Sequence, residues 1–339
     1  MNPPESLDQM PEHSAGGAGR RVEDIDVAGA AGAIPAYPGV GPRRPGRRTS
    51  TARLLLVAIL GLTLVVAAAG LFIAQRGGLT APAVQPGSSA LDSAPAPIMG
   101  EPAAPALVSM VVDIPQAEIA AVGPGYDAGG AARIDPLAAV NGPRLVAPGS
   151  KPQLLYIGGE FCPYCAAVRW SLLNALSRFG TFSGLRYMRS ADNDGNIATF
   201  TFARGTYHSP YLDFVMREAS DRDRKDLQPL TNAQELLDLT LGHGGVPFID
   251  INGRYILNSN AAGYPTSNDA KLLIGMDWAQ IAQALQNAND PITGGTIGSA
   301  TFIVAAICSQ TADRPASACK TPTIRSIEGQ LPRKPATGG

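Results

Sequence analysis

The sequence QLLYIGGEFCPYC occupies residues 153–165 and decides the fold class. Residues 153–158 form a short apolar run between Pro152 and a Gly-Gly pair, a pattern that favours a buried central strand. Residues 162–179 then repeat apolar side chains at helical spacing, and Gly180 follows where a helix commonly ends. The stretch therefore predicts a strand that leads directly into a helix with two cysteines at its start.

Cys162 and Cys165 are spaced so that their thiols can close a small, reversible disulfide ring. The start of a helix has unpaired backbone N–H groups and the positive end of the helix dipole, which favour a thiolate. Pro163 suits the first helical position because its missing N–H is not needed there. We expect Cys162 to be the attacking sulfur and Cys165, one turn further in, to be the resolving sulfur.

The same spacing also occurs in half of many zinc sites and in static disulfides. A tetrahedral zinc site needs a second close pair of ligands, but Cys308 and Cys319 are 11 positions apart. The histidines beyond the N-terminal tail are His208 and His243, which are not adjacent either. We favour redox chemistry and expect no metal ion and no cofactor, with metal binding and a static disulfide as the alternatives.

A second informative stretch is GGVPFIDINGRY, residues 244–255. Residues 246–251 favour a strand, Asn252-Gly253 a two-residue turn, and residues 254–257 the partner strand. A proline is tolerated at the first residue of a strand because it cannot donate to the sheet. From the residues alone, the Val246–Pro247 bond can be cis or trans.

These motifs together resemble the thioredoxin fold: a strand, CPYC at a helix start, and much later a proline, a strand, a turn and a strand. The resemblance implies a cis proline that faces the CxxC, so that the backbone at Val246 and Pro247 pairs with a substrate chain. The CPYC motif itself is similar to that of glutaredoxins. Tyr164, inside the motif, is the aromatic residue that we expect to touch a partner.

A closer resemblance is to the thioredoxin-like domain of unknown function 929, over about residues 108–319. It extends through IPQAEIAAVG, LLYIGGEFCPYCAAVRW, VPFIDINGRY and AAICSQTADRPASAC. The resemblance implies one domain with an enlarged middle and C-terminal part, and it specifies no substrate.

The remaining segments predict further elements of an α/β domain. Residues 185–190 favour a second core strand, completing a βαβ unit, and residues 197–203 and 211–218 a hairpin. Residues 108–114 have β-branched character, and the charged run 221–226 is expected to be a solvated turn. Helices are expected at 115–122, 231–241, 278–286 and 301–308.

Three neighbours of the motifs have two interpretations each. Glu160 is either an acid or base for thiol proton transfer or an exposed loop carboxylate. Trp170 is more consistent with a core position than with a substrate contact. His243 is either close to the active edge or an ordinary loop residue.

Cys308 and Cys319 form the remaining pair of cysteines. Outside the cytoplasm, an even leftover pair is usually bonded, so we expect a structural disulfide. The alternative is a relay pair, which requires one of these sulfurs to reach Cys162 or Cys165.

Residues 54–74 form an apolar run of 21 residues without charge, about 31 Å long as a helix, which is enough to cross a hydrocarbon core. Five arginines lie between residues 43 and 53, whereas residues 77–132 contain no Lys or Arg. This bias predicts a single-pass helix with the N-terminus in the cytoplasm. A cleaved signal peptide is the alternative, but the polar region before the run is too long for a usual signal.

The predicted organisation follows from these segments and from composition. It comprises a disordered cytoplasmic tail (1–52), a transmembrane helix (53–76), an Ala/Pro/Gly-rich linker (77–107), a thioredoxin-like domain (108–325) and a disordered C-terminal tail (326–339). The fold class is therefore α/β, thioredoxin-like with insertions and C-terminal helices, preceded by one transmembrane helix.

The net charge and the predicted compartment limit the classes of function that the chain can have. The 27 Lys and Arg nearly balance the 28 Asp and Glu, which excludes a strongly basic nucleic-acid binder. We expect a membrane-anchored thiol:disulfide oxidoreductase, an oxidase or isomerase, that acts on extracytoplasmic protein cysteines. A reductase would need a membrane redox partner to deliver electrons. The alternative is a binding or Cu(I)-delivery protein that holds the ion between Cys162 and Cys165.

Overall fold

The computed structural model describes residues 97–126, 130, 137–145, 147, 149–258 and 267–332. The chain divides into two compact units, residues 1–81 and 82–339, and all described residues belong to the second. The predicted cytoplasmic tail, the transmembrane helix at 53–76 and most of the linker lie outside the described residues.

A mixed five-stranded sheet forms the centre of the described unit, in the order β1-β9-β8-β2-β7. Strand β2 runs parallel to β7 and antiparallel to β8, and β9 pairs antiparallel with both β8 and β1. The strands are β1 (Ala138–Ala139), β2 (Gln153–Gly159), β7 (Asp213–Ser220), β8 (Phe248–Ile251) and β9 (Tyr255–Asn258).

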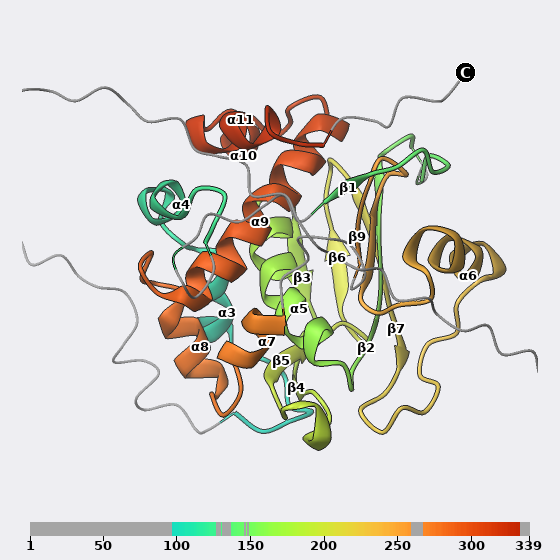
Figure 1. The fold of residues 1–339 in the computed structure, drawn as a ribbon, viewed down its shortest axis with the longest axis vertical. Helices are drawn as coiled ribbons and strands as arrows, with labels where there is room; N and C mark the ends of the chain where they lie inside the picture. Colours follow the sequence, from blue (N-terminus) through green and yellow to red (C-terminus); the bar gives the residue numbers. More distant parts are fainter. Residues whose placement is uncertain are drawn as a thin grey trace, which may run out of the picture. The chain divides into compact units, whose positions relative to one another are not determined.

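Strand β2 is buried on both faces because its apolar side chains alternate between two clusters. Leu154 and Tyr156 pack into the larger cluster, whereas Leu155 and Ile157 pack into the smaller one. Helix α5 (Pro163–Leu176) belongs to the larger cluster and α6 (Asn232–Leu237) to the smaller. The two helices therefore cover opposite faces of the sheet (Figure 1).

The βαβ unit that the sequence predicted uses a different second strand. Residues 186–189 form β4, which pairs with β5 (Ala198–Thr201) in a separate two-stranded sheet. Strands β3 (Thr181–Ser183) and β6 (Thr206–His208) form another two-stranded sheet, and β7 is the parallel partner of β2. The prediction of a hairpin between 197–203 and 211–218 was wrong, because apolar patterning identifies strands but not their partners.

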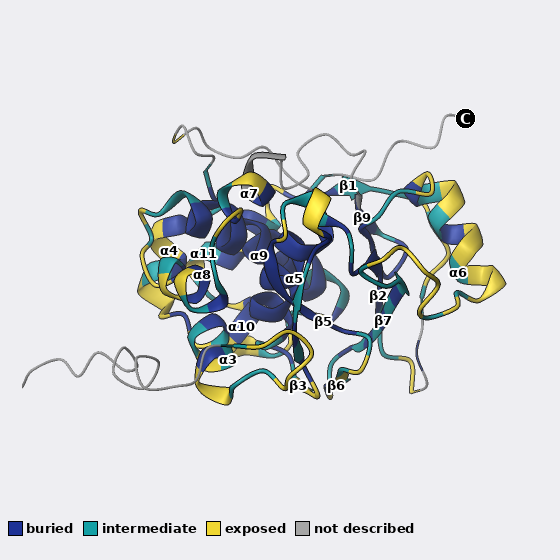
Figure 2. Cartoon of the chain, turned by 90° about the horizontal axis from the view of Figure 1, so that it is seen from below, coloured by how far each residue is buried: buried dark blue, intermediate teal, exposed yellow. Residues whose placement is uncertain are grey.

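Helices enclose the larger apolar cluster, with α5 and the long α9 (Pro291–Gln310) packed against each other at its centre. Figure 2 shows both as almost continuously buried. The surrounding helices are α3 (Pro105–Val112), α4 (Gln116–Val122), α7 (Ser267–Leu272), α8 (Trp278–Ala284), α10 (Ala316–Cys319) and α11 (Pro322–Glu328). A 3-10 turn, η1 (Asp192–Asp194), and a π-helical turn, η2 (Asp238–Gly242), complete the described elements.

Two segments differ in type or length from the sequence-based expectation. The β-branched stretch near residue 108 lies partly in helix α3, where Leu107 and Val111 face the core, so packing overrides intrinsic preference. Helix α9 extends well beyond the predicted 301–308. Helix α11 includes residues 326–328, which the sequence analysis assigned to the C-terminal tail.

Helix α9 is long and apolar enough to cross a membrane, but 94% of its apolar window is buried inside the fold. Helices α3 and α4 pass the same test only when taken together, and they are bent by 53°. Among the described residues, the apolar side chains of α9 therefore pack in the larger apolar cluster, at the centre of the helical layer.

Candidate redox site

The two motif cysteines lie at the junction of β2 and α5. Cys162 is the N-cap of α5, with an extended backbone (φ −76°, ψ 127°), and Pro163 follows at the first helical position. The Cys162 sulfur accepts a hydrogen bond from the backbone N–H of Cys165 at 3.2 Å. The sulfur therefore takes the place of the oxygen that usually caps a helix.

The second motif meets the first across the end of the sheet. The Cys162 sulfur lies 3.6 Å from the backbone oxygen of Val246, although the two residues are 84 positions apart. The Val246–Pro247 bond is cis, and β8 begins directly after it. The structure thus brings together Cys162, Cys165, Val246 and Pro247, and it places Tyr164 half-buried against the core.

The pKa values of the two thiols are shifted in opposite directions. Hydrogen bonding with Cys165, helped by backbone N–H groups and the charge of Arg169, lowers the pKa of Cys162 from its ordinary value. Complete burial raises the pKa of Cys165 well above its ordinary value, and Cys162 adds to this rise. Cys162 is therefore the sulfur that ionises first, and Cys165 stays protonated behind it.

A buried ion pair lies behind the cysteines and was not predicted. Arg169 and Glu218 are both fully buried, and the guanidinium binds the carboxylate through Nε at 2.9 Å and Nη2 at 2.6 Å. Nη2 also donates to the backbone oxygen of Gly159 at 3.0 Å. Burial opposes the charge on Arg169, but Glu218, Tyr156 and Cys165 together raise the pKa of Arg169 well above its ordinary value.

The sequence contained a signal for this pair. Arg169 interrupts an otherwise apolar helical stretch between Val168 and Trp170, and Glu218 lies near the end of the apolar run of β7. A charge inside such a pattern indicates a buried partner. The partner could not be identified, because the parallel pairing of β7 with β2 was not predicted.

Glu160 is buried rather than exposed on a loop. It is 6% exposed, and its Oε1 accepts a hydrogen bond from the hydroxyl of Thr201. Burial raises the pKa of Glu160 above its ordinary value. Trp170 is fully buried and donates to the Ala198 carbonyl, and His243 is exposed at the end of η2.

The charged run at 221–226 is a largely exposed turn, as predicted, and two of its arginines also contact neighbouring segments. Arg224 lies 4.0 Å above the ring of Phe161, the residue before Cys162, and pairs with Asp194. Arg222 pairs with Asp192 and donates to the Ser190 carbonyl. The run therefore contacts the loop that presents Cys162.

Comparison with known protein families bears on this same segment. Residues 139–239 match the model of a domain of unknown function, DUF929. The predicted resemblance to that family is confirmed over this range. The match contains CPYC, Arg169 and Glu218 and ends before Val246. No curated protein and no solved structure matches the chain.

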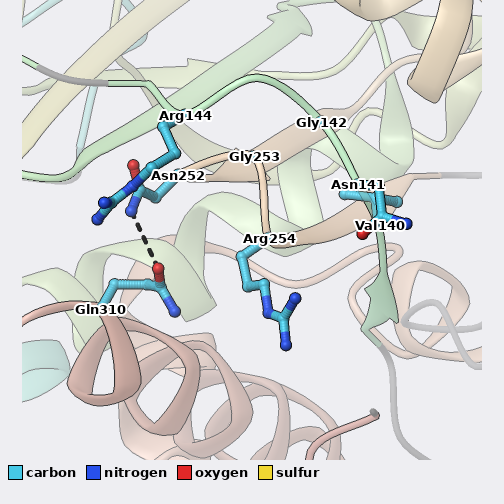
Figure 3. Close-up of a pocket in the computed structure, with 8 residues that line it drawn as sticks. All are labelled: Val140, Asn141, Gly142, Arg144, Asn252, Gly253, Arg254 and Gln310. Carbon is cyan, nitrogen blue, oxygen red and sulfur yellow. Dashed lines mark hydrogen bonds between the residues drawn. The ribbon is translucent and has the colours of Figure 1, made fainter. Parts of the chain in front are cut away.

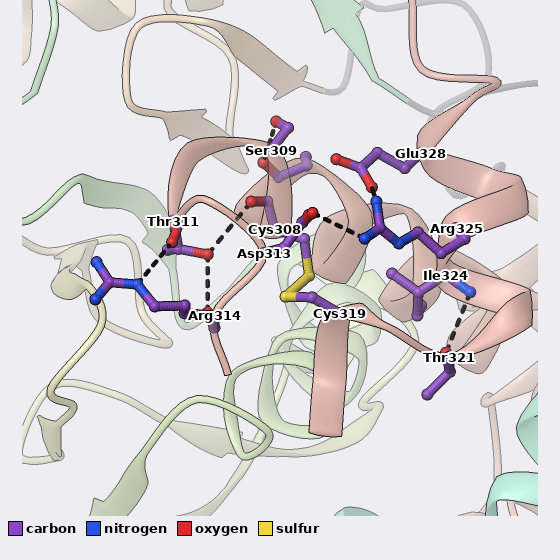
Figure 4. Close-up of a disulfide and its surroundings, with 11 residues drawn as sticks. Cys308, Ser309, Thr311, Asp313, Arg314, Cys319, Thr321, Ile324, Arg325 and Glu328 are labelled. Carbon is purple, nitrogen blue, oxygen red and sulfur yellow. Dashed lines mark hydrogen bonds and ion pairs between the residues drawn. A yellow bond between two sulfur atoms is a disulfide. The ribbon is translucent and has the colours of Figure 1, made fainter. Parts of the chain in front are cut away.

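The remaining cysteines lie beyond the DUF929 match and form a disulfide. Cys308, in α9, and Cys319, at the end of α10, are joined with their Cα atoms 5.5 Å apart (Figure 4). Both are fully buried, and Arg325 of α11 pairs with Asp313 in the intervening loop at 3.0 Å. The disulfide ties the end of α9 to the short helices that follow, whereas Cys162 and Cys165 are free thiols.

A cavity of about 230 Å³ lies at the other end of β8 from Pro247 (Figure 3). It includes the turn between β8 and β9, where the side chain of Asn252 donates to Gln310 at 2.9 Å. Its lining residues are Val140, Asn141, Gly142, Arg144, Asn252, Gly253, Arg254 and Gln310. The cavity is therefore separate from the cysteine pair.

Proposed function

We propose that the chain is a membrane-anchored thiol:disulfide oxidoreductase that acts on extracytoplasmic protein cysteines as an oxidase or isomerase. The observation that supports it is the position of the Cys162 sulfur at the start of α5, beside the backbone oxygen of Val246. An acidified thiol beside a backbone carbonyl can attack a disulfide, while that backbone can align the chain that contains it.

The order of the core elements supports a thioredoxin-like arrangement. Strand β2 leads into the CPYC helix, β7 lies parallel to β2, and β8 and β9 return antiparallel after the cis proline. The β3–β6 and β4–β5 sheets are then insertions between α5 and β7, and α7 to α11 are C-terminal additions.

The proposed chemistry is disulfide exchange through a mixed disulfide. As an oxidase, the protein begins with a Cys162–Cys165 disulfide, and a substrate thiolate attacks Cys162 and releases Cys165. A second substrate thiolate then attacks the first substrate sulfur and releases Cys162. The substrate gains one disulfide, and the protein keeps two thiols that an oxidising partner must reoxidise.

The compartment and partners follow from the sequence. The arginine bias before residues 54–74 supports an extracytoplasmic position for the cysteine pair. Disulfides persist in oxidising compartments, and the Cys308–Cys319 bond is consistent with that environment. The substrates are then extracytoplasmic proteins with cysteines, and a membrane redox partner restores the active form.

The first prediction is that Cys165→Ser traps substrate proteins on Cys162. Trapping reports the isomerase direction, in which reduced Cys162 alone attacks a substrate disulfide, whereas release of that mixed disulfide by the protein's own second thiol needs Cys165. Trapped partners are detected as reductant-sensitive high-mass species on a non-reducing gel of the full chain. Cys162→Ser is the matched control, since it also removes one thiol and should trap nothing.

The same preparation separates exchange from metal delivery. The wild-type chain in detergent should catalyse insulin reduction and refolding of scrambled ribonuclease, and Cys162→Ser should not. If Cys165→Ser captures nothing and the wild type instead holds one Cu(I) per chain tightly, the two thiols serve as a Cu(I)-delivery site.

A further inference from the structure

The Arg169 guanidinium is held one helical turn beyond Cys165, on the same face of α5. Side chains in helices extend toward the N-terminus, so Arg169 extends toward the cysteines. The guanidinium and the Cys165 sulfur contact the same residue, since Arg169 Nη2 donates to the Gly159 oxygen and the Gly159 N–H lies 3.5 Å from the sulfur. The two side chains therefore share one short stretch of backbone.

One donor of this guanidinium has no acceptor in the reduced protein. Arg169 Nη1 is buried and makes no hydrogen bond within the described part of the chain. Leaving a buried, charged donor unpaired is costly, and such a group gains most from a negative charge that appears nearby. Cys165, which contacts the same glycine as this guanidinium, is the buried group whose negative charge the exchange reaction requires.

We propose that Arg169 is a positioning residue for disulfide exchange, which stabilises the Cys165 thiolate during the resolving step, and that Glu218 fixes the guanidinium in place. This proposal rests on the proposed function and extends it to two residues outside the CPYC motif. The hydrogen bonds from Nε and Nη2 to Glu218 fix the plane of the guanidinium and leave Nη1 available as a donor.

Cys165 releases its proton to solvent, and its thiolate attacks the Cys162 sulfur of the mixed disulfide. The Cys162–Cys165 bond forms while the bond from Cys162 to the partner sulfur breaks, and the partner leaves as a thiolate that takes up a proton. No external oxidant or reductant is needed.

The surrounding charges act in opposite directions on Cys165. Arg169 favours its thiolate and Glu218 opposes it, and the effect of Arg169 is the larger. Tyr156, whose hydroxyl lies 3.5 Å from Glu218 Oε2, is kept neutral because burial raises its pKa well above its ordinary value. In the reduced protein Cys162 opposes the Cys165 thiolate more strongly than Arg169 favours it. In the mixed disulfide Cys162 carries no charge, so Arg169 and Glu218 together favour the thiolate, against the cost of burial.

The simpler alternative is that Arg169 and Glu218 only connect α5 to β7. Replacing both with methionine discriminates the two roles, because exchanging a buried ion pair for apolar side chains is often neutral for stability. If the pair only connects the two elements, the double variant should fold and should exchange disulfides at the normal rate. Our proposal predicts a folded protein that forms the mixed disulfide but resolves it slowly.

The experiment uses the reduced full chain in detergent and the chromogenic disulfide 5,5′-dithiobis(2-nitrobenzoate). The first equivalent of released thiolate reports attack by Cys162, and the second reports resolution by Cys165. In Arg169→Met/Glu218→Met we expect the second phase to slow by about tenfold at pH 7, with its pH profile moved to higher pH. Arg169→Lys, which keeps the charge, should recover most of the rate.

Glu218→Gln supplies a test of opposite sign. It removes the opposing charge while its amide oxygen can still accept from Arg169, so the second phase should become faster and its pH profile should move to lower pH. A purely structural role of the pair predicts that the second phase of thiolate release is slower or unchanged. Unchanged second-phase rates in both the methionine pair and Glu218→Gln would overturn the proposal while leaving the proposed function intact. A wild-type chain that releases no second equivalent would instead overturn the proposed function.

Discussion

Gly253, in the turn between β8 and β9, has a conformation and surroundings that only glycine satisfies. Its φ is +65°, and an added Cβ would lie 2.0 Å from the carbonyl oxygen of Pro143. Left-handed backbone and a backbone clash act together at this position. The Asn-Gly turn, which the sequence predicted, is therefore fixed by contact with the segment beside β1 as well as by local preference.

Gly253→Ala should destabilise the protein by roughly 3 kcal/mol or more, because the added strain comes with a forced movement of backbone. Gly275→Ala is the matched control: its φ is +81°, and nothing lies within 4 Å of the added carbon. We expect the control to lose only about 1 kcal/mol. Guanidinium unfolding of the two variants and the wild type measures both values, and equal losses would contradict the role of the Pro143 contact.

Single residues also show where sequence analysis succeeds and where it does not. Cys162, Cys165 and Pro247 lie together as the motifs predicted, because each motif specifies its own local setting. Arg169 and Glu218 were missed because their role depends on which strand lies beside β2, a tertiary fact. Glu160 was ambiguous for the same reason, since its burial depends on Thr201 of β5.

At the scale of elements, strand β8 begins directly after Pro247 of the candidate site and contains a buried carboxyl group, that of Asp250. Asp250 is fully buried in the middle of the strand, and its Oδ1 accepts from the Gly253 N–H at 2.6 Å. Its Oδ2 has no partner among the described residues. Burial accordingly raises the pKa of Asp250 from 3.8 to about 6.

This shift makes stability depend on pH in a defined direction. Between about pH 4 and 6, the folded chain holds a proton on Asp250 that the unfolded chain has released, so the free energy of unfolding falls as the pH rises. Above pH 6 both states are ionised and the loss is complete. Asp250→Asn removes this loss, because its amide oxygen can still accept from Gly253.

We therefore expect the free energy of unfolding of Asp250→Asn, relative to that of the wild type, to increase by about 2 kcal/mol when the pH is raised from 4.5 to 7.5. Urea unfolding at the two pH values gives the difference. Asp226→Asn, at an exposed position, is the control and should show no comparable change. A gain for Asp250→Asn that is the same at both pH values would show that its carboxyl group is not the cause.

Strand identity was easier to predict than strand partnership. The apolar runs that became β2, β5, β7, β8 and β9 were all recognised, and the turn between β8 and β9 specified its own pairing. Residues 185–190 were assigned to the central sheet as the strand that follows the CPYC helix, although β4 itself (RYMR) is far less apolar than β2. The antiparallel pairing of β4 with β5 instead depends on the path of residues 177–212, which local patterns do not specify.

At the scale of the whole molecule, two apolar segments are long enough to cross a membrane, and they have different settings. Residues 54–74 follow a cluster of arginines and lie outside the described residues. Helix α9 packs against α5, where the hydroxyl of Ser171 donates to the Thr296 carbonyl at 2.9 Å. Its apolar surface is occupied by protein, so we expect residues 54–74, and not α9, to cross the membrane.

The number of crossings decides on which side of the membrane the C-terminus lies, and this gives the last prediction. With residues 54–74 as the single crossing, alkaline phosphatase fused after Gly339 should be active, and a cytoplasmic reporter at the same position should be silent. If α9 also crossed, the C-terminus would return to the cytoplasm and both signals would invert. A second fusion after Gly87 separates the causes, because it follows the first apolar segment only. Activity after Gly87 with silence after Gly339 would mean that α9 spans the membrane, whereas silence at both would contradict the extracytoplasmic position of Cys162 and Cys165.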